Sequence, residues 1–524
     1  MDEDIIIGSG PAGAAAAEAL LDRGRRVRML DVGETLEPAR EAVRLSLAGA
    51  KPAAWDAGAL DDFKRARPAA KTDTMRPYGS DFPFRDAVDF FGPEGRPDWL
   101  FLKPSFALGG LSNGWGASVL PYREEDISDW PAAARALAAH YAAVAAFVPI
   151  AANPDPLEAL FPMLSISDDR SLPLTSQGQA ALARLEKRRE RLAARGLHFG
   201  RARQAVEASG CERCGLCLYG CPYRLIFSAK SHVERLVRER GLDYRPGAEA
   251  VRILEGSSGV TVATRDPRSG ETAEHRGARV FVGAGVLPTA RLMLASLGAE
   301  GKAVRLKDST HFFVPMLHAW APRPDPVAEP RHTLTQLYLE ILDAAVNART
   351  VHFQVYAYND HYAEDMRARF GRLAPLAEPL IAAMSRRLMV AQGFLHSDSS
   401  PEIEIRLAGG AEPRLAFALR RNEETGPAIA RAVRKLAPLV VPSGLLPLLP
   451  LVRPAEVGSS YHCGGTFPMR EAPSGLESDP LGRPAGLKRV HIVDASVFPS
   501  VPATTITLTV MANAHRIASA APAP

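Results

Sequence analysis

The stretch that decides the fold is Ile5-Ile-Ile-Gly8-Ser-Gly10-Pro11-Ala12-Gly13, near the start of a chain of 524 residues. Its apolar run predicts a buried strand, and the Ala-rich run that follows predicts a helix. Glycines in a G-x-G-x-x-G spacing at such a junction are typical of a dinucleotide site. They allow a sharp turn, close approach of a pyrophosphate and close packing of the helix on the strand, while the helix N-terminus offers free amides to phosphate.

A second strand, Arg26-Val-Arg-Met-Leu, ends at Asp31. A carboxylate at this distance from the glycine run is where a ribose hydroxyl group lies in dinucleotide folds. The strand, turn, helix, strand and terminal acid together predict an α/β fold that opens with a Rossmann-like unit. Alternating stretches such as Ile403-Glu-Ile-Arg-Leu predict an antiparallel sheet elsewhere in the chain.

Composition is that of a globular protein, with 46% hydrophobic and 23% charged residues. The formal charge of +4 is spread along the chain, which argues against nucleic acid and in favour of a small-molecule substrate. The N-terminus has no basic, apolar signal, so a cytoplasmic location is expected. The apolar segment 436–452 is interrupted by four prolines, and it is interpreted as a buried or partner-covered loop or as a loop that contacts a membrane peripherally.

Four separated segments resemble the glucose-methanol-choline (GMC) family of FAD oxidoreductases. They are the N-terminal glycine run, the loop LGGLSNGWG at 108–116, the segment ARVFVGAGVLPTARLMLASLG at 278–298, and the region 462–514. The resemblance implies a three-layer FAD-binding domain and a substrate (cap) domain with an antiparallel sheet and helices. It also implies non-covalent FAD, because Gly114 stands where some relatives carry the His that attaches the flavin.

The resemblance extends the N-terminal run to a full set of cofactor contacts. In the second segment, Gly109 and Gly110 are expected to let the backbone approach the flavin ring. Near the C-terminus, Asp494 and the amides after it are expected to meet the ribityl and pyrophosphate groups. The predicted cofactor-binding residues are Gly8, Gly10, Pro11, Ala12, Gly13, Asp31, Gly109, Gly110, Ser112, Asn113, Trp115, Val251, Gly285, Asp494, Ala495 and Thr504.

The segment Tyr461-His462-Cys463-Gly-Gly-Thr466 resembles the family segment whose His faces the flavin. Hydride leaves an alcohol carbon only as the hydroxyl proton departs, so His462 is the predicted base. Thr505 stands where the family has a second catalytic Asn or His. It is assigned either to a substrate contact or, with Thr504, to the cap of the last helix.

Cys211, Cys214, Cys217 and Cys221 form a C-x2-C-x2-C-x3-C-P run, the spacing of bacterial iron-sulfur sites. The sequence predicts a 4Fe-4S or 3Fe-4S cluster that passes electrons from FAD to an external protein or quinone. Zinc and plain structural thiols are the alternatives. His311, His352 and His396 are left unassigned, because isolated His residues are usually satisfied structural groups.

The predicted activity is dehydrogenation of an alcohol or of a sugar or polyol hydroxyl group. A flavin-dependent desaturase, reductase or isomerase of a lipophilic substrate, or an FAD-binding electron carrier, are the other hypotheses. The predicted FAD-binding domain comprises 1–120, 205–310 and 455–524, with the Cys run inserted at 209–225. The predicted cap comprises 121–204 and 311–454.

Overall fold

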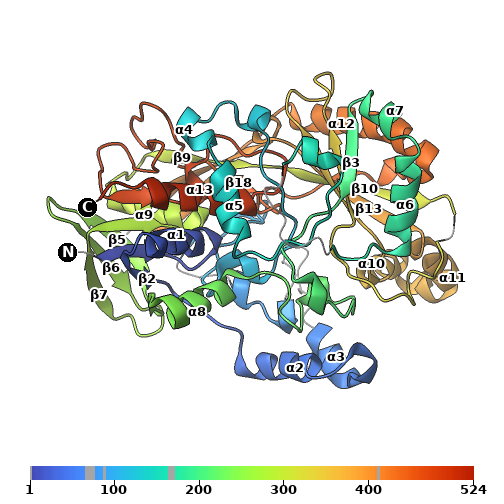
Figure 1. The fold of residues 1–524 in the computed structure, drawn as a ribbon, viewed down its shortest axis with the longest axis horizontal. Coiled ribbons are helices and arrows are strands. Elements are labelled where there is room, and N and C mark those ends of the chain that lie inside the picture. Colours follow the sequence, from blue (N-terminus) through green and yellow to red (C-terminus); the bar gives the residue numbers. More distant parts are fainter. Residues whose placement is uncertain are drawn as a thin grey trace.

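The computed structural model describes residues 3–64, 77–85, 90–162, 171–320, 322–409 and 413–523. Two lobes lie side by side, and both ends of the chain are found on the outer side of one of them (Figure 1). That lobe is built on a parallel sheet and the other on an antiparallel sheet. The architecture is the α/β fold with an added antiparallel domain that the sequence predicts.

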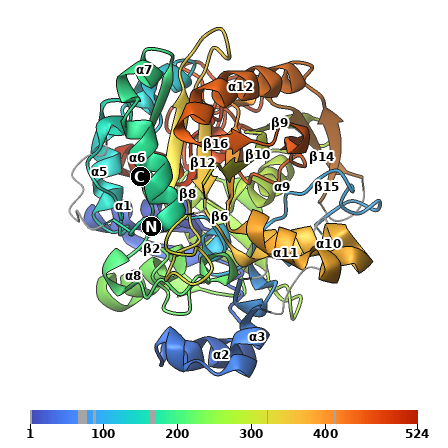
Figure 2. The same cartoon turned by 90° about the vertical axis from the view of Figure 1, so that its right-hand side faces the viewer.

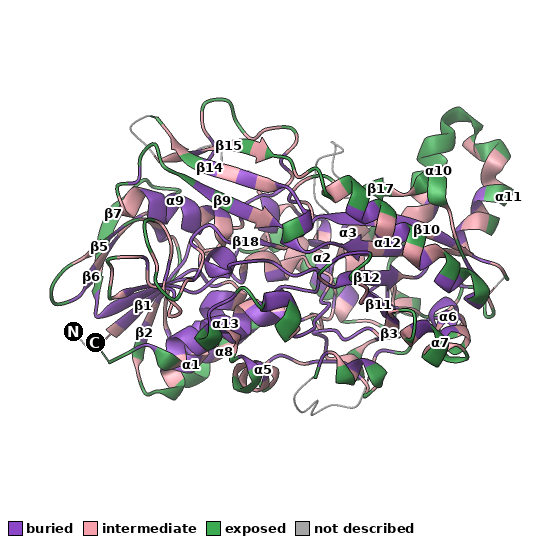
Figure 3. Cartoon of the chain, turned by 90° about the horizontal axis from the view of Figure 1, so that it is seen from above, coloured by how far each residue is buried: buried purple, intermediate pink, exposed green. Residues whose placement is uncertain are grey.

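The first lobe contains a five-stranded parallel sheet in the order β19-β8-β1-β2-β4. Helix α1 follows β1 directly and packs beside the last helix, α13, on one side of this sheet, while a three-stranded sheet and α9 lie on the other side (Figure 3). The elements are β1 (Glu3–Ile7), α1 (Pro11–Asp22), β2 (Arg26–Leu30), α8 (Ala229–Arg240), β4 (Asp243–Arg245), β5 (Glu249–Glu255), β6 (Val260–Arg265), β7 (Thr272–Gly277), β8 (Arg279–Val282), α9 (Val286–Ser296), β19 (Val490–Ile492) and α13 (Thr507–Ala520).

The second lobe is built on an antiparallel sheet in the order β16-β10-β13-β12-β11-β3, with β17 paired to β10. One face of the sheet packs against α6 and α12 in a separate apolar core. The elements are α6 (Ser176–Glu186), α7 (Arg189–Ala193), β3 (Leu197–Arg201), β10 (His311–His318), β11 (Leu337–Ile341), β12 (Val351–Tyr356), β13 (Leu388–Phe394), α12 (Thr425–Val440), β16 (Leu445–Pro447) and β17 (Arg453–Pro454).

A third antiparallel sheet, in the order β15-β14-β9-β18, joins distant parts of the chain. The alternating stretch at 403–407 lies here, as β14, and not in the large cap sheet. Because β18 follows His462 directly, this sheet helps to fix the predicted base. The strands are β9 (Ala303–Asp308), β14 (Glu402–Ala408), β15 (Arg414–Arg420) and β18 (Cys463–Gly464).

The other helices lie outside these sheets. Helices α10 and α11 project from the second lobe with mostly exposed surfaces (Figures 2 and 3). These helices are α2 (Pro38–Ala48), α3 (Ala57–Lys64), α4 (Ala132–Arg135), α5 (Ala138–Ala145), α10 (Asp360–Phe370) and α11 (Ala374–Ser385). Segment 436–452 contains the end of α12, which includes Pro438, and then β16, so it is more ordered than the predicted loop. None of the described helices has the length and apolarity needed to cross a bilayer.

A buried ion pair joins β1 to β8. Arg279 donates to Asp4 through Nε at 2.9 Å and Nη2 at 2.6 Å, and the Asp4 side chain is fully buried. Arg279 also donates to the Ala521 carbonyl group at 3.3 Å, which secures the end of the chain after α13.

We predict that Asp4→Ala lowers the free energy of unfolding by about 3 to 5 kcal/mol, because Arg279 would stay buried without its counter-ion. Glu378→Ala, in the exposed pair with Arg367, is the control and should leave the free energy of unfolding almost unchanged, because water screens an exposed pair. Urea unfolding followed by circular dichroism measures both. Equal losses of unfolding free energy in the two variants would show that the buried pair stabilises the fold no more than an exposed pair does.

Candidate active site

Glycines from three predicted segments meet at the N-terminus of α1. A methyl group added at Gly13 would overlap the Gly8 carbonyl oxygen, and one added at Gly8 would lie 2.6 Å from the Gly283 carbonyl oxygen. One added at Gly110 would approach the Cα atom of Gly10 to 3.2 Å. Helix α1 starts at Pro11 with no side-chain cap, so its first amides are left to a ligand. This cradle fits the pyrophosphate of a dinucleotide.

Asp31 lies at the end of β2, within reach of the same cradle. Its carboxylate accepts hydrogen bonds from the Ser9 hydroxyl group and from the Tyr244 hydroxyl group at 3.1 Å. Ser9 Oγ in turn accepts from the Gly109 amide at 2.9 Å, which ties the two glycine loops together. Burial raises the pKa of Asp31 to about 7. An acidic group kept in this environment fits the predicted ribose contact.

In the second loop, at 108–116, the polar side chains mainly form hydrogen bonds with backbone groups of the protein itself. Ser112 donates to the Gly109 carbonyl group at 2.5 Å and accepts from the Ala229 amide at 2.9 Å. Asn113 donates to the carbonyl groups of Leu108 and Gly110, and Trp115 donates to that of Phe227. Gly109 packs on α8, where an added methyl group would lie 2.5 Å from the backbone nitrogen of Lys230. Flavin contacts from this loop therefore stay a prediction.

Asp494 connects the third segment to the C-terminal segment. Its carboxylate accepts from the Gly285 amide at 2.9 Å, from the Thr289 hydroxyl group at 2.5 Å and from the Ser496 amide at 2.9 Å. Burial raises its pKa. These bonds place the start of α9 beside the turn η13 (Ala495–Val497). Because Gly285 follows Gly283 by two residues, η13 lies close to the glycine cradle. Because both carboxylate oxygens bond to protein, positioning is the role that the geometry supports for Asp494.

Val251 is the predicted cofactor residue with the weakest link to the cradle. It lies at a bulge in β5, three residues after Ala248, whose amide donates to the Asp31 carbonyl oxygen at 2.9 Å. Its contact with the nucleotide stays a prediction.

The C-terminal turn brings the last predicted residues to the same region. Thr504 Oγ1 is buried without a hydrogen-bond partner among the described residues, whereas Thr505 Oγ1 accepts from the Leu120 amide at 2.8 Å. The predicted capping role of both Thr residues is wrong, because α13 begins at Thr507 after Ile506. The Thr505 hydroxyl group is therefore held by the Leu120 amide, whereas the Thr504 hydroxyl group is open to a ligand.

His462 lies where the C-terminal segment meets the cap sheet. Its ring stacks on Phe394 of β13, with centroids 5.0 Å apart and planes 19° apart. The side chain keeps some solvent contact, but Nδ1 is buried and has no partner among the described residues. Burial, followed by the nearby His311 and His352, lowers the pKa of His462 to about 3. The imidazole is therefore neutral near pH 7 and able to accept a proton.

Backbone contacts fix His462 relative to the turn η13. Ser309 donates its amide to the His462 carbonyl oxygen at 2.9 Å. Just beyond, Gly465 donates to the Ala495 carbonyl oxygen at 2.9 Å, so this segment runs along η13. Asp308 holds the preceding loop by accepting from Gly458 and Ser460 at 3.1 and 2.9 Å. The neighbouring Cys463 thiol points to Asp308, and burial raises its pKa well above the ordinary value, which argues against a reactive thiolate.

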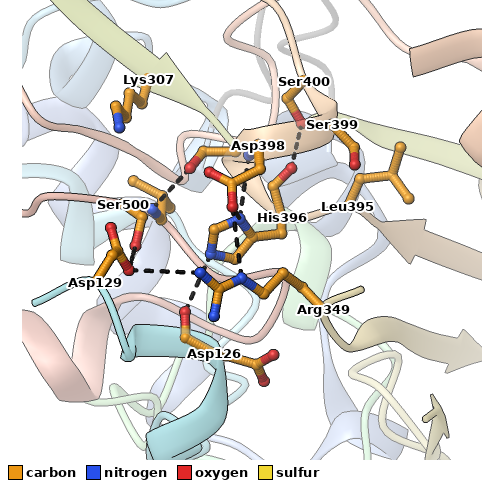
Figure 4. A network of polar contacts seen from close by, with 12 residues as sticks. Asp126, Asp129, Lys307, Arg349, Leu395, His396, Asp398, Ser399, Ser400 and Ser500 are labelled. Carbon is orange, nitrogen blue, oxygen red and sulfur yellow. Dashed lines mark hydrogen bonds and ion pairs between the residues drawn. The ribbon is translucent and has the colours of Figure 1, made fainter. Parts of the chain in front are cut away.

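A polar network holds the C-terminal turn at Ser500 and Val501 against the cap (Figure 4). His396 lies between the Asp126 carbonyl oxygen, at 3.1 Å from Nε2, and Asp398, at 3.2 Å from Nδ1. Ser500 donates to Asp129 at 2.7 Å, and Val501 donates to the Ser397 hydroxyl oxygen at 3.0 Å. His396 is therefore a satisfied structural group that helps to hold the C-terminal turn against the cap.

The four cysteines of the run are partly exposed, and their thiols lie close enough to influence one another. Burial raises the pKa of Cys214 to about 11 and that of Cys217 to about 12, and the other thiols raise both further. Within the described ranges, however, no three His, Cys, Asp or Glu side chains are gathered to hold a metal ion. The thiols as arranged here do not fit the predicted cluster, because each Fe ion requires thiolates that converge on it.

Comparison with known proteins supports the family resemblance. Residues 448–514 match the C-terminal model of the GMC oxidoreductases. The predicted resemblance to the GMC family is thereby confirmed. A solved structure with a similar fold is pyridoxine 4-oxidase from Mesorbium loti, with 16% identity, a TM-score of 0.58, and coverage of 99% of this chain and 98% of that one. No curated protein matches the chain.

These findings bear on the predicted class of enzyme. The GMC match supports an FAD-dependent enzyme that acts on CH–OH donors. The similar solved structure shows that the fold is shared. They support neither an iron-sulfur cluster nor a particular substrate. Sequence reasoning missed Tyr244 and Asp308, which no motif marks, and Ser9, which occupies a variable position of the glycine motif. It also left His311 and His352 unassigned, although both lie near His462.

We predict that Gly13→Ala abolishes flavin incorporation and lowers the melting temperature, because the methyl group has no room beside Gly8. Gly10→Ala is the matched control. A methyl group there meets nothing within 4 Å, so the variant should melt normally, and any loss of flavin would report contact with the cofactor itself. The ratio of flavin to protein absorbance and a thermal melt measure both. Full flavin content in Gly13→Ala would contradict the cradle.

We predict less than about one iron per chain after anaerobic purification, because the thiols are not arranged around a common centre. Elemental analysis and the absorption spectrum measure this directly, with Cys217→Ser as the matched control. Three or four irons per chain that disappear in Cys217→Ser would contradict the arrangement described here.

Proposed function

We propose that this protein oxidises an alcohol, transferring hydride from the substrate carbon to FAD while His462 accepts the hydroxyl proton. The observation that carries the proposal is the place of His462. It stands between Phe394 of the cap sheet and the turn η13. Asp494 links η13 to Gly285, two residues after Gly283 of the glycine cradle. Bound FAD would supply the hydride acceptor. The GMC model over 448–514 and the fold shared with pyridoxine 4-oxidase support the same reaction class.

Different residues of the chain have different roles in the proposed reaction. The cradle at Gly8 and Gly13, together with Asp31, would hold the nucleotide. The neutral imidazole of His462 orients the substrate hydroxyl group and takes its proton, which raises the electron density at the carbon that loses hydride. Thr505 already accepts from the Leu120 amide, so it positions the turn and has one hydroxyl proton left to offer.

The external electron acceptor, a protein or quinone, stays a prediction, as does the cytoplasmic location. No step is assigned to the Cys run, because its thiols are not gathered as a cluster site. Segments 331–333 and 213–217 pair through the Gly215 amide and the Arg331 carbonyl oxygen at 2.9 Å. The run therefore fastens the cap to the first lobe in the structure as it stands.

We predict that His462→Ala reduces the rate of anaerobic flavin reduction by alcohols about 10²- to 10⁴-fold, the usual contribution of general base catalysis. Stopped-flow absorbance of the flavin band measures the rate, and the flavin content of the variant should be unchanged. His396→Ala is a control for a His outside the site, and it should affect melting more than rate. A His462→Ala enzyme within threefold of the wild type would remove the proposed base.

The pKa of His462 sets the acid side of the pH profile. A base must be unprotonated to act, and a pKa lowered to about 3 keeps this imidazole unprotonated as the pH falls through the neutral range. We predict that kcat/KM shows no loss due to His462 between about pH 7 and pH 5. An acid limb centred near pH 6.5 that disappears in His462→Ala would show that the ring titrates normally.

A further inference from the structure

Helices α10 and α11 form a hairpin that presents apolar side chains to solvent. The two helices are joined by the short turn η9 (Gly371–Leu373), and the hairpin connects strands β12 and β13 of the cap sheet. It projects from the second lobe, at the opposite end of the molecule from both chain ends (Figures 1 and 3). The outer surface of the α10–α11 hairpin is therefore open to a partner outside the chain.

Four large apolar side chains lie on this outer surface and form what is called here the outer stripe. The exposed fractions are 36% for Phe370, 62% for Leu373, 84% for Leu376 and 53% for Leu380. Leu373, Leu376 and Leu380 are spaced three and four residues apart, as residues on one face of a helix are. Single exposed apolar residues are ordinary on a protein surface, but a row of neighbouring ones marks an interaction site.

Other residues hold the hairpin in place. Ile381 of α11 is fully buried, and Arg331 pairs with Asp360 at the start of α10 at 3.2 Å. Arg367 donates to Glu378 through Nε at 3.0 Å and Nη2 at 2.6 Å, which joins the two helices to each other. None of these contacts uses a residue of the outer stripe. Polar substitutions in the outer stripe are therefore expected to leave the hairpin folded.

The charges beside the outer stripe are positive. The sequence from 366 to 377 carries Arg367, Arg369 and Arg372 but no Asp or Glu. Arg367 is paired with Glu378, whereas Arg369 and Arg372 are exposed and form no ion pair with the described part of the chain. An apolar helix face flanked by Arg residues is typical of helices that lie in the interface of a membrane with anionic lipids.

The size of the outer stripe favours a membrane over a folded protein as its partner. A stable protein interface buries about 800 Å² on each partner and includes about 20 to 30 residues a side. The outer stripe consists of four apolar side chains on a projecting hairpin. A bilayer needs no matching groove, because apolar side chains enter the boundary between its headgroups and acyl chains. A lipid surface therefore fits this hairpin better than a second copy of the chain does.

We propose that the α10–α11 hairpin docks the protein peripherally on a membrane that contains anionic lipids. The outer stripe enters the boundary between headgroups and acyl chains, while Arg369 and Arg372 contact the lipid phosphate groups. This surface differs from segment 436–452, for which the sequence predicts a partner or membrane contact. The inference is independent of the proposed reaction, because lipid binding is measured without turnover.

The test is flotation of the holoenzyme with lipid vesicles in a sucrose gradient. We expect the protein to float with vesicles of phosphatidylglycerol and phosphatidylcholine, and to bind phosphatidylcholine alone at least about fivefold more weakly. Raising NaCl from about 0.05 M to about 0.5 M should weaken the binding, because salt screens the Arg contacts. The double variant Leu373→Ser/Leu376→Ser should lower the partition coefficient about tenfold or more, because two apolar side chains no longer enter the bilayer. Arg369→Gln/Arg372→Gln should remove most of the preference for the anionic vesicles.

Leu449→Ser is the matched control, because Leu449 is also 53% exposed but lies in segment 436–452, and it should leave the partition coefficient unchanged. The flavin content and melting temperature of each variant report whether the fold is intact. Protein that does not float with either kind of vesicle would overturn this inference, as would binding that is lost in Leu449→Ser but kept in the double Leu variant. A dimer in light scattering that becomes monomeric in the double Leu variant would also overturn it, because a second copy would then cover the outer stripe.

Discussion

The structure depends on the close approach of backbone segments at the start of α1. Gly8 and Gly13 nearly touch, and Gly283 closes on them from β8. Side chains at these positions would separate α1 from β1 and β1 from β8. The same approach leaves the first amides of α1 without partners, so the constraint that permits tight packing also creates the phosphate site.

From this point a chain of contacts leads to the proposed base. Gly285 follows the close approach directly and binds Asp494 at the start of η13. The segment after His462 pairs with η13, and His462 itself stacks on Phe394 of the cap sheet. The proposed proton acceptor, near the end of the polypeptide, is thus fixed against the dinucleotide fold formed by its beginning. The buried network around His396 and the ion pair of Asp4 with Arg279 keep the two ends in register.

The sequence predicts the parts of this arrangement that depend on local pattern. The turn at Gly8, the strand that ends at Asp31 and the segment around His462 each carry a short signal whose physical meaning is local. The predicted cap at Thr504 and Thr505 is wrong, because α13 begins at Thr507 after Ile506. Thr505 instead accepts from the amide of Leu120, which is far away in sequence. The place of His311 opposite Phe394 also lies beyond sequence reasoning, since only strand register brings the two residues together. The Cys run has a strong spacing signal, but its spacing does not determine where the thiols point.

The central claim is that both ends of the chain meet around one flavin, with His462 beside it. A crystal structure of the FAD-loaded protein tests it most directly. We expect the pyrophosphate at the start of α1 and the His462 imidazole facing the reactive side of the flavin ring, with room for one substrate hydroxyl group between them. A flavin bound elsewhere, or a ring that His462 does not face, would contradict it.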